Sequence, residues 1–195
     1  MIGAVLCGGR SRRMGSPKAL LPWAGGDLLG HALSILSAAG IEPVCLGPAE
    51  WAERHGAAAL ADAVQDAGPL GGVLAAVAKD DVFLIAVDMP LLTAGEMRAL
   101  AAYGEAQKTL MLPAQDGMLR ALCGYWPREL AQPLEDYLRS GERRVLGFAD
   151  RVPHRYLDDG DLRRIGVDPG HLLGLNTREE YEAALAAARV KGLQS

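Results

Sequence analysis

The chain of 195 residues contains little cysteine, no long apolar run and no excess of positive charge. Its three cysteines, Cys7, Cys45 and Cys123, lie far apart and lack CxxC spacing, which argues against a disulfide framework and a zinc site. The longest strongly apolar stretch, residues 82–87, is far too short to cross a bilayer. The net charge of −4 argues against a broad face for duplex nucleic acid. We therefore expect a cytoplasmic protein without membrane or nucleic-acid partners.

The remaining composition is that of a globular domain. Half of the residues are apolar and 23% are charged. A chain of this length suits one domain, and folding at this size hides roughly 70% of the surface of the unfolded chain. Residues 1–7 are apolar but lack a basic leader, so we interpret them as a first strand and not as a signal peptide. We expect residues 1–195 to form one α/β domain.

Short apolar runs alternate with segments of helical spacing, which is the pattern of a βα-repeating fold with a largely parallel sheet. Thr93 and Glu96 have the spacing of a capping box and predict a helix start, and Gly40 predicts a helix end. The irregular stretch 154–174 predicts a surface-exposed functional loop. Strands are predicted at residues 2–7, 43–46, 57–60, 82–87, 109–112 and 119–125, and helices at residues 28–39, 69–78, 93–102, 129–138, 143–148 and from 176 through 188.

A glycine-rich, basic turn follows the first predicted strand. Residues 6–18 read LCGGRSRRMGSPK, with paired glycines, three arginines and Lys18. Glycines at the carboxyl end of a strand let the backbone approach a ligand and point N–H groups at anions, and ligands of open α/β sheets bind at that end. The pattern is neither GxGxxG nor the P-loop. Phosphate binding is the functional interpretation, and a turn with solvated arginines is the alternative.

Asp88 follows the most apolar predicted strand and should leave the sheet at the same edge as the glycine-rich turn. A carboxylate at this place would hold Mg²⁺, which usually binds through one or two carboxylates together with substrate phosphates. The alternative is that Asp88 only caps the turn before Pro90. Together with the basic turn, the pattern favours magnesium binding.

Two further segments place glycine next to charged residues. Asp62 precedes Gly-Pro-Leu-Gly-Gly at residues 68–72, where small residues would let a flat nucleobase approach the backbone. The segment GERRV at residues 141–145 presents Arg143 and Arg144 before an apolar helical stretch, as a docking site for an anion would. A tight helix entry and a solvated charged turn are the alternatives for these two segments.

Five segments follow one another in the order LCGGRSRRMGSPKALL, ADAVQDAGPLGGV, FLIAVDMPLL, GERRVLGF and LNTREEY. From Ile2 to about Glu182 this order resembles the molybdenum cofactor guanylyltransferases. The first segment is shared by many nucleotidyltransferases, whereas Gly-Pro-Leu-x-Gly combined with Gly-Glu-Arg-Arg-Val is more specific. The resemblance implies a single three-layer domain with a mostly parallel, doubly wound sheet of the Rossmann-like nucleotidyltransferase fold. It also implies Mg²⁺-dependent transfer of GMP from GTP to the terminal phosphate of molybdenum-carrying molybdopterin, with release of pyrophosphate.

The resemblance places the reaction centre at Lys18, Asp88 and Arg13. Asp88 would bind Mg²⁺ and the nucleotide together, and Lys18 would contact the phosphates of GTP. Because the attacking group is an anionic phosphate, no general base is needed. The positions implied to bind GTP are Leu6, Cys7 and Gly8 through their backbone, together with Gly9, Arg12, Lys18, Asp62, Gly68, Pro69, Leu70 and Asp88.

The molybdopterin side is implied to involve Arg143, Arg144 and Asn176, and enzymes that insert or accept the molybdenum cofactor would be partners. Two positions depart from the family pattern. The family usually has a second asparagine where this chain has Gly174, and an asparagine at the end of the second strand where this chain has Gly47. Neither departure touches Lys18 or Asp88.

Three alternatives compete with guanylyl transfer. A cytidylyltransferase of the same pathway typically has alanine in place of Gly8 and lacks the Gly-Pro-Leu-x-Gly loop, and the missing Cβ at Gly8 leaves room for a purine. A sugar-phosphate nucleotidyltransferase shares the glycine-rich turn and lysine but usually has a longer chain. A non-catalytic protein that binds nucleotide or delivers the cofactor would have no use for both Lys18 and Asp88.

Overall fold

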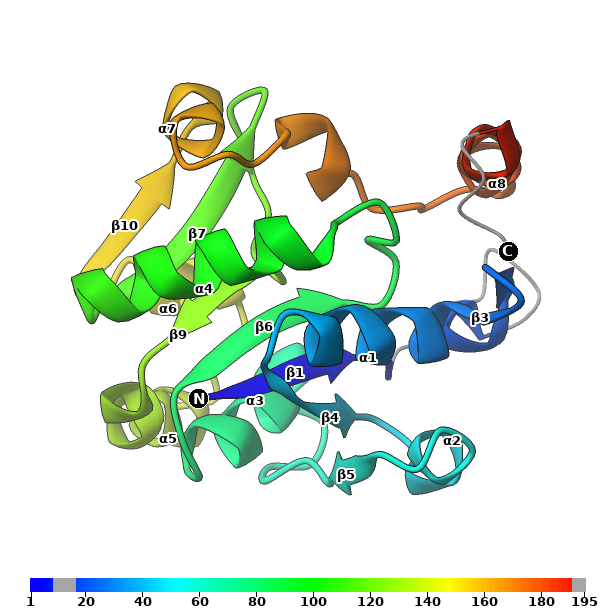
Figure 1. The fold of residues 1–195 in the computed structure, drawn as a ribbon. Coiled ribbons are helices and arrows are strands. Elements are labelled where there is room, and N and C mark those ends of the chain that lie inside the picture. The colour runs from blue at the N-terminus through cyan, green and yellow to red at the C-terminus, as the bar shows by residue number, and fades with distance from the viewer. Residues whose placement is uncertain (9–16, 191–195) are drawn as a thin grey trace.

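The computed structural model describes residues 1–8 and 17–190, with side chains through Ala188. Its centre is a twisted sheet (Figure 1). Four of the strand pairs are parallel, and one antiparallel strand lies between two groups of parallel strands. The strands lie side by side in the order β10 (His154–Leu157), β7 (Leu110–Gln115), β9 (Gly124–Trp126), β6 (Val82–Ala86), β1 (Ile2–Leu6), β4 (Glu42–Leu46) and β5 (Ala58–Leu60). The antiparallel strand is β9, and β8 (Met118–Leu119) pairs with the end of β7.

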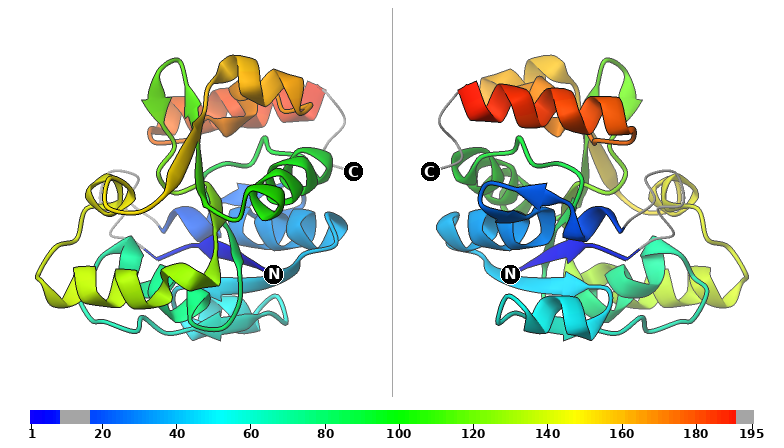
Figure 2. Two further views of the ribbon diagram at one scale, coloured as in Figure 1. Left: turned by 90° about the vertical axis from the view of Figure 1, so that its left-hand side faces the viewer. Right: turned by 90° about the vertical axis from the view of Figure 1, so that its right-hand side faces the viewer.

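Helices cover both faces of this sheet, and the edge-on views of Figure 2 show the sheet between them. The first face carries α1 (Leu28–Ala38), α2 (Ala49–Glu53), α4 (Ala94–Gln107), α7 (Asp159–Arg164) and α8 (Arg178–Val190). The second face carries α3 (Pro69–Val77), α5 (Ala131–Arg139) and α6 (Val145–Ala149). The mostly parallel α/β fold expected from the sequence is therefore confirmed. The division into one domain stays a prediction.

The alternation of side chains along the strands builds the two cores. Phe83 and Ile85 of β6 face the first core, whereas Leu84 of the same strand faces the second. All five residues of β6 are buried because helices cover the sheet on both sides, which explains the unbroken apolar run there. Within residues 1–8 and 17–190, no helix is both long enough and apolar enough to span a membrane.

The helix ends follow the expected chemistry. Thr93 accepts a hydrogen bond from the backbone N–H of Glu96, and the Glu96 carboxylate accepts one from the N–H of Thr93, so the capping box is confirmed. Gly40, which follows the C-cap residue Ala39 of α1, has a φ of +80°, a conformation that glycine adopts without strain. The side chain of Asp27 caps the other end of α1 by accepting from the N–H of Gly30 at 2.8 Å.

Replacing Glu96 by glutamine is expected to lower the free energy of unfolding by about 1–3 kcal/mol near neutral pH. Burial acts to raise the pKa of Glu96, but hydrogen bonds from the backbone N–H groups of Asp168 and Thr93 outweigh it, so the pKa lies below its ordinary value of 4.5. Because the pKa of Glu96 is lower in the folded state than in the unfolded state, the carboxylate stabilises the fold fully when the pH is above the ordinary pKa. This stabilisation is lost as the pH falls through the pKa of the folded state.

Urea unfolding at neutral and at acidic pH measures this loss, with the exposed Glu105→Gln on the same helix as control. An unfolding free energy of Glu96→Gln equal to that of the wild type at neutral pH would contradict the role of the capping box.

The predicted strand 119–125 is wrong as a single element. β8 ends at Leu119, and a turn stabilised by the hydrogen bond from Cys123 N–H to the carbonyl of Arg120 precedes β9. Gly124 begins β9 with a φ of +143°, and a Cβ there would lie 2.0 Å from the carbonyl oxygen of Met111. β8 pairs with β7 alone, whereas β9, which begins at Gly124, pairs with both β7 and β6.

The predicted loop 154–174 is also wrong, because much of it is regular structure. It contains β10, α7 and a short 3-10 helix at Pro169–Leu172. Asp158 caps α7 by accepting from the N–H of Asp161 at 2.8 Å, and Asp168 caps the 3-10 helix by accepting from the N–H of Gly170 at 2.9 Å. These aspartates were the signals of order in the sequence.

Candidate functional site

The carboxyl edge of the parallel strands brings the end of β1 next to the end of β6, which leads to Asp88. β1 and β6 are neighbours in register, with Leu6 opposite Ala86, and the backbone N–H of Val87 donates to the carbonyl of Leu6 at 3.1 Å. Residues that continue β1 and β6 therefore leave the sheet side by side. In Figure 1 the arrows of β1, β4 and β6 point toward this edge.

Lys18, Asp88 and Asn176 form a polar cluster at this edge. The Nζ of Lys18 donates to Asp88 Oδ2 at 2.6 Å and to Asn176 Oδ1 at 3.0 Å. The side chains of Lys18 and Asp88 are 17% and 18% exposed, so their ion pair is only partly screened by water. The cluster joins residues from three distant parts of the sequence.

The backbone around the cluster is tied down on both sides. The N–H of Leu175 donates to the carbonyl of Asp88 at 2.8 Å, and the Nδ2 of Asn176 donates to the carbonyl of Gly174 at 3.0 Å. The carboxylate of Glu180 in α8 accepts from the N–H of Asn176 at 2.6 Å. These hydrogen bonds orient Asn176 toward Lys18.

Gly174 packs closely against the second oxygen of Asp88. A Cβ at position 174 would lie 3.3 Å from Asp88 Oδ1, whereas Lys18 engages Oδ2. Among the described residues, no cluster of three or more His, Cys, Asp or Glu side chains is placed to hold a metal. A magnesium ion with one carboxylate ligand takes its remaining oxygens from water and substrate phosphates. The hard oxygens of Asp88 fit such an ion, since Lys18 engages Oδ2 and no hydrogen bond of the described residues uses Oδ1.

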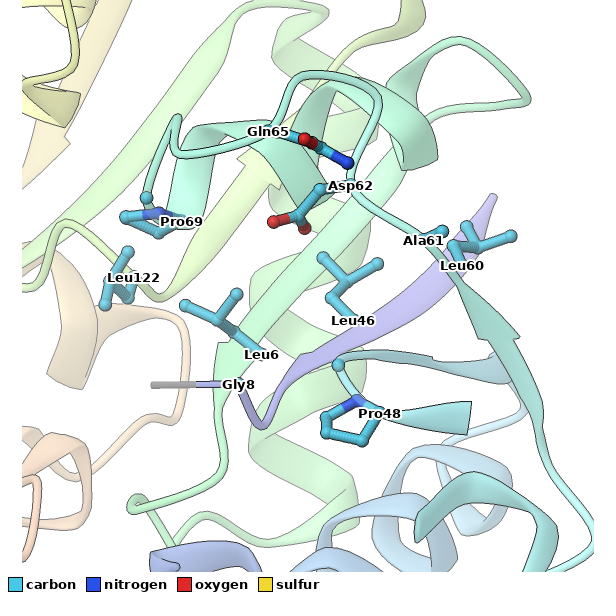
Figure 3. A pocket seen from close by; sticks show the side chains of 12 residues that line it. Leu6, Gly8, Leu46, Pro48, Leu60, Ala61, Asp62, Gln65, Pro69 and Leu122 are labelled. Atoms are coloured by element: carbon cyan, nitrogen blue, oxygen red, sulfur yellow. The ribbon is translucent and has the colours of Figure 1, made fainter. Parts of the chain in front are cut away.

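A pocket of about 620 Å³ opens beside this edge, on the side of β4 and β5 (Figure 3). Its wall is mostly apolar, and the two polar side chains that project into the region in Figure 3 are those of Asp62 and Gln65. Burial raises the pKa of Asp62 above its ordinary value. The pocket is lined by Leu6, Gly8, Leu46, Gly47, Pro48, Leu60, Ala61, Asp62, Gln65, Gly68, Pro69 and Leu122.

Glycines bring Asp62 close to the start of α3. A Cβ at Gly71 would lie 2.7 Å from the carbonyl oxygen of Val64, and one at Gly72 would lie 3.1 Å from the Cβ of Leu46. Gly68 precedes the helix with a φ of +62°, which strains any other residue. The Gly-Pro-Leu-Gly-Gly segment therefore has a packing role as well as a place in the pocket wall.

The end of β1 is more tightly bound to β4 than the sequence predicted. The N–H groups of Cys7 and Gly8 both donate to the carbonyl of Leu46 at 3.2 Å, so these two donors are already used within the chain. The sulfur of Cys7 lies 2.7 Å from that of Cys45, and a Cβ at Gly47 would lie 2.5 Å from the Cys7 sulfur. An asparagine at position 47 would therefore collide with Cys7.

Some predicted site residues do not join the cluster or the pocket. Leu70 is fully buried in the core, so its side chain does not reach the pocket. Arg143 donates to the carbonyls of Leu138 and Glu142 at the end of α5, and the carbonyl of Arg144 accepts from Tyr137. Within residues 1–8 and 17–190, neither arginine contacts Lys18 or Asp88. The predicted residues Gly9, Arg12 and Arg13 lie outside the described residues.

Sequence reasoning missed part of the pocket wall. Leu122 reaches the pocket from the turn before β9, although it is distant in sequence from the other lining residues. Pro48 and Gln65 also line the pocket. Pro48 follows a predicted strand at the sheet edge where ligands bind, and this was a usable signal. No signal in the sequence indicated Leu122, because its position depends on the insertion of β9 between β6 and β7.

The sequence and the fold match known nucleotidyltransferases. Residues 3–154 match the family described as the MobA-like NTP transferase domain. The probable molybdenum cofactor guanylyltransferase of Pyrococcus furiosus is 34% identical over 152 residues, which cover 74% of this chain and 77% of that relative.

Solved structures extend the likeness to the whole fold. Molybdopterin-guanine dinucleotide biosynthesis protein A from Archaeoglobus fulgidus is similar with a TM-score of 0.85 at 24% identity, over 97% of this chain and 99% of that one. A Mycobacterium tuberculosis protein crystallised in complex with manganese is similar with a TM-score of 0.63 at 22% identity, over 95% and 98% of the two chains. The chain therefore belongs to the MobA-like NTP transferase family, together with the molybdenum cofactor guanylyltransferases, and is an enzyme of the nucleotidyltransferase class.

Proposed function

We propose that this enzyme transfers GMP from GTP to the terminal phosphate of molybdenum-carrying molybdopterin and releases pyrophosphate. The observation that carries the proposal is the contact of Lys18 with Asp88 at 2.6 Å, beside a pocket of nucleotide size. Lys18, a cation that can bind phosphates, and Asp88, a carboxylate that can bind a metal, thus lie next to an apolar cavity with a few polar groups. The named function of the relatives supports the choice of guanine and molybdopterin.

The pocket is the proposed site of the guanosine. Leu46, Pro48 and Pro69 offer apolar surface to a flat base, and Gly8 lets the base or the ribose approach the backbone of β1. The carboxylate of Asp62 is an acceptor for N–H or O–H groups of the nucleoside. From this pocket the triphosphate extends toward Lys18 along the carboxyl edge of the sheet.

Asp88 is the residue proposed to hold Mg²⁺, through its oxygen beside Gly174. When bound, the ion would polarise the phosphoryl oxygens and neutralise their charge. Asn176 keeps the ammonium of Lys18 pointed into the same space at 3.0 Å. Lys18 would then exchange its contact with Asp88 for the phosphates of GTP.

The reaction needs positioning and charge stabilisation more than acid–base chemistry. An oxygen of the acceptor phosphate forms a bond to the α-phosphorus of GTP, while the bond from that phosphorus to the β-phosphate bridging oxygen breaks and its electron pair leaves with pyrophosphate. The acceptor oxygen is already ionised, so no proton is removed. Lys18 would stabilise the negative charge that collects on the departing pyrophosphate.

Release of pyrophosphate tests the proposal. With Mg²⁺ and GTP present, we expect pyrophosphate to appear only after purified molybdopterin is added, in proportion to the acceptor consumed. A protein that only binds or delivers the cofactor would release none, and that result would reject the enzymatic proposal.

The variant Gly8→Ala is expected to raise KM for GTP by about tenfold or more, because an added methyl group occupies pocket space. A Cβ at this position would meet its nearest protein atoms at 3.6 and 3.7 Å, which is ordinary contact, so the variant should fold normally. Gly95→Ala, on the surface of α4, is the matched control. Steady-state kinetics with GTP and CTP measure the effect, and an unchanged preference between the two nucleotides would argue against base discrimination at Gly8.

We further propose a cytoplasmic location for the enzyme. The three cysteines are buried, and no disulfide joins them in the structure. Disulfides are rare in cytosolic proteins, and three cysteines that lie far apart in the sequence without CxxC spacing fit such a compartment.

A further inference from the structure

Arg120 is a half-buried arginine in the turn between β8 and β9. Its backbone N–H donates to the carbonyl of Pro113 at 2.7 Å, which fixes the turn against the end of β7. Its guanidinium donates through Nη2 to Oε1 of Gln115 at 2.6 Å. Its Nε is buried and finds no partner in the described part of the chain.

Within residues 1–8 and 17–190, the charge of Arg120 lacks a counter-ion. Among residues 1–8 and 17–190, no carboxylate lies within ion-pair distance of its guanidinium, and its one side-chain partner is the neutral amide of Gln115. The sequence outside these ranges, residues 9–16 and 191–195, contains no aspartate or glutamate. Half-buried cations in proteins are normally paired, because burial of an unpaired charge is costly.

Arg143 provides a contrast within the same molecule. It is also half-buried and has no acidic partner among the described residues, but it donates to two backbone carbonyls at the end of α5. The negative end of a helix stabilises a cation at that place. Arg120 contacts no helix end among the described hydrogen bonds, so its missing partner is expected to come from a ligand.

The turn that carries Arg120 borders the candidate site. β9 runs antiparallel to β6 with Gly124 opposite Leu84, so the residues before Gly124 lie toward the carboxyl end of β6, which continues to Asp88. Leu122 lines the pocket beside Leu6 in Figure 3. The Cα of Arg120 lies within about 7 Å of that of Leu122, since two residues of chain span no more.

The position of this turn favours the acceptor over the nucleotide. Leu122 is the lining residue contributed from the β9 side, whereas most of the wall comes from β1, β4, β5 and the start of α3. A nucleoside in the pocket therefore lies on the β4 side of β1, and Arg120 lies across β6 from it. A second substrate that attacks the α-phosphorus has to approach from the opposite side to the leaving group.

We propose that Arg120 binds an anionic oxygen group of the acceptor substrate and holds the acceptor beside Asp88. This inference rests on the proposed function for the identity of the acceptor. Two groups of molybdenum-carrying molybdopterin share the required chemistry, its terminal phosphate and the oxygens on its molybdenum. Either one would supply the counter-ion that Arg120 lacks, through charge-assisted hydrogen bonds to a planar guanidinium.

Arg120→Gln tests the inference through direct binding and kinetics. We expect the Kd for molybdopterin, measured by the fluorescence of its pterin, and the KM for the acceptor to rise by about tenfold to a hundredfold. The KM for GTP should stay within about twofold of the wild-type value, because the nucleotide does not use this charge. Arg120→Lys keeps the charge without the planar fork and should recover part of the loss. Arg54→Gln, an exposed arginine in the turn after α2, is the matched control.

Metal-free and molybdenum-loaded molybdopterin separate the two anionic groups. An equal loss with both forms assigns Arg120 to the phosphate, and a loss confined to the loaded form assigns it to the molybdenum oxygens. An equal rise in the KM for GTP, or an unchanged Kd for both acceptor forms in a folded Arg120→Gln or Arg120→Lys variant, would overturn the inference.

The same titration separates failure of this inference from failure of the proposed function. A wild-type protein that neither binds molybdopterin nor transfers GMP to it would reject both. A wild-type protein that binds and modifies molybdopterin, together with a variant of equal affinity, would reject only the role of Arg120.

Discussion

Replacing Lys18 by alanine is expected to lower kcat by about 10²- to 10³-fold, the usual cost of removing one preorganised group that stabilises developing charge. Lys18 is the described cation that contacts the proposed metal ligand, at 2.6 Å from Asp88 Oδ2. Its loss would leave the departing pyrophosphate without that positive charge. Single-turnover measurements at saturating GTP and acceptor report the effect on the chemical step.

The matched control for this variant is Lys79→Ala, because Lys79 is exposed and lies in the turn after α3. Its turnover should equal that of the wild type. A folded, GTP-saturated Lys18→Ala enzyme with wild-type turnover would remove Lys18 from the reaction centre.

Asp88→Asn is expected to lower kcat by about 10²- to 10³-fold, because several kcal/mol of metal-assisted charge stabilisation are lost. Asparagine has nearly the same shape as aspartate, so the hydrogen bond from the N–H of Leu175 to the carbonyl of residue 88 should persist. The dependence of the rate on Mg²⁺ concentration should move to higher concentration or vanish. Asp136→Asn on the exposed face of α5 serves as the control. An unchanged Mg²⁺ dependence in Asp88→Asn would show that another group holds the metal.

The contact between Lys18 and Asp88 also predicts competition between the ammonium and a metal ion. The ammonium of Lys18 occupies one oxygen of Asp88. A divalent cation that binds to Asp88 without nucleotide is therefore repelled by Lys18. In Lys18→Ala, Mn²⁺ should bind more tightly than in the wild type while turnover falls, and electron paramagnetic resonance of free Mn²⁺ measures this binding. Weaker Mn²⁺ binding in that variant would contradict the competition.

The architecture was predictable where local signals and global packing agree. The apolar run at residues 82–87 predicted β6, and the Thr93–Glu96 spacing predicted the start of α4. The order of the strands was not predictable in the same way, since β9 enters between β6 and β7 through the backbone conformation of Gly124. The regular structure within residues 154–174 was missed because its elements are short and depend on pairing with β7.

The candidate site was predictable at its centre and less so at its rim. The rule that ligands bind at the carboxyl ends of parallel strands correctly brought Lys18 and Asp88 together. The contact of Asn176 with Lys18 was unforeseen, because 158 residues separate them and no pattern in the sequence joins them. The hydrogen bonds from the N–H groups of Cys7 and Gly8 to the carbonyl of Leu46 were also unforeseen, because no pattern in the sequence indicates them.

The mass of the product formed from a panel of nucleotides tests the central claim most directly. Purified enzyme is incubated with Mg²⁺, molybdenum-carrying molybdopterin and each of GTP, ATP, CTP and UTP in turn. The account predicts a product with the mass of the acceptor joined to GMP, formed with GTP far faster than with the other three nucleotides. A product that carries CMP, or none with any nucleotide from a folded enzyme, would contradict it.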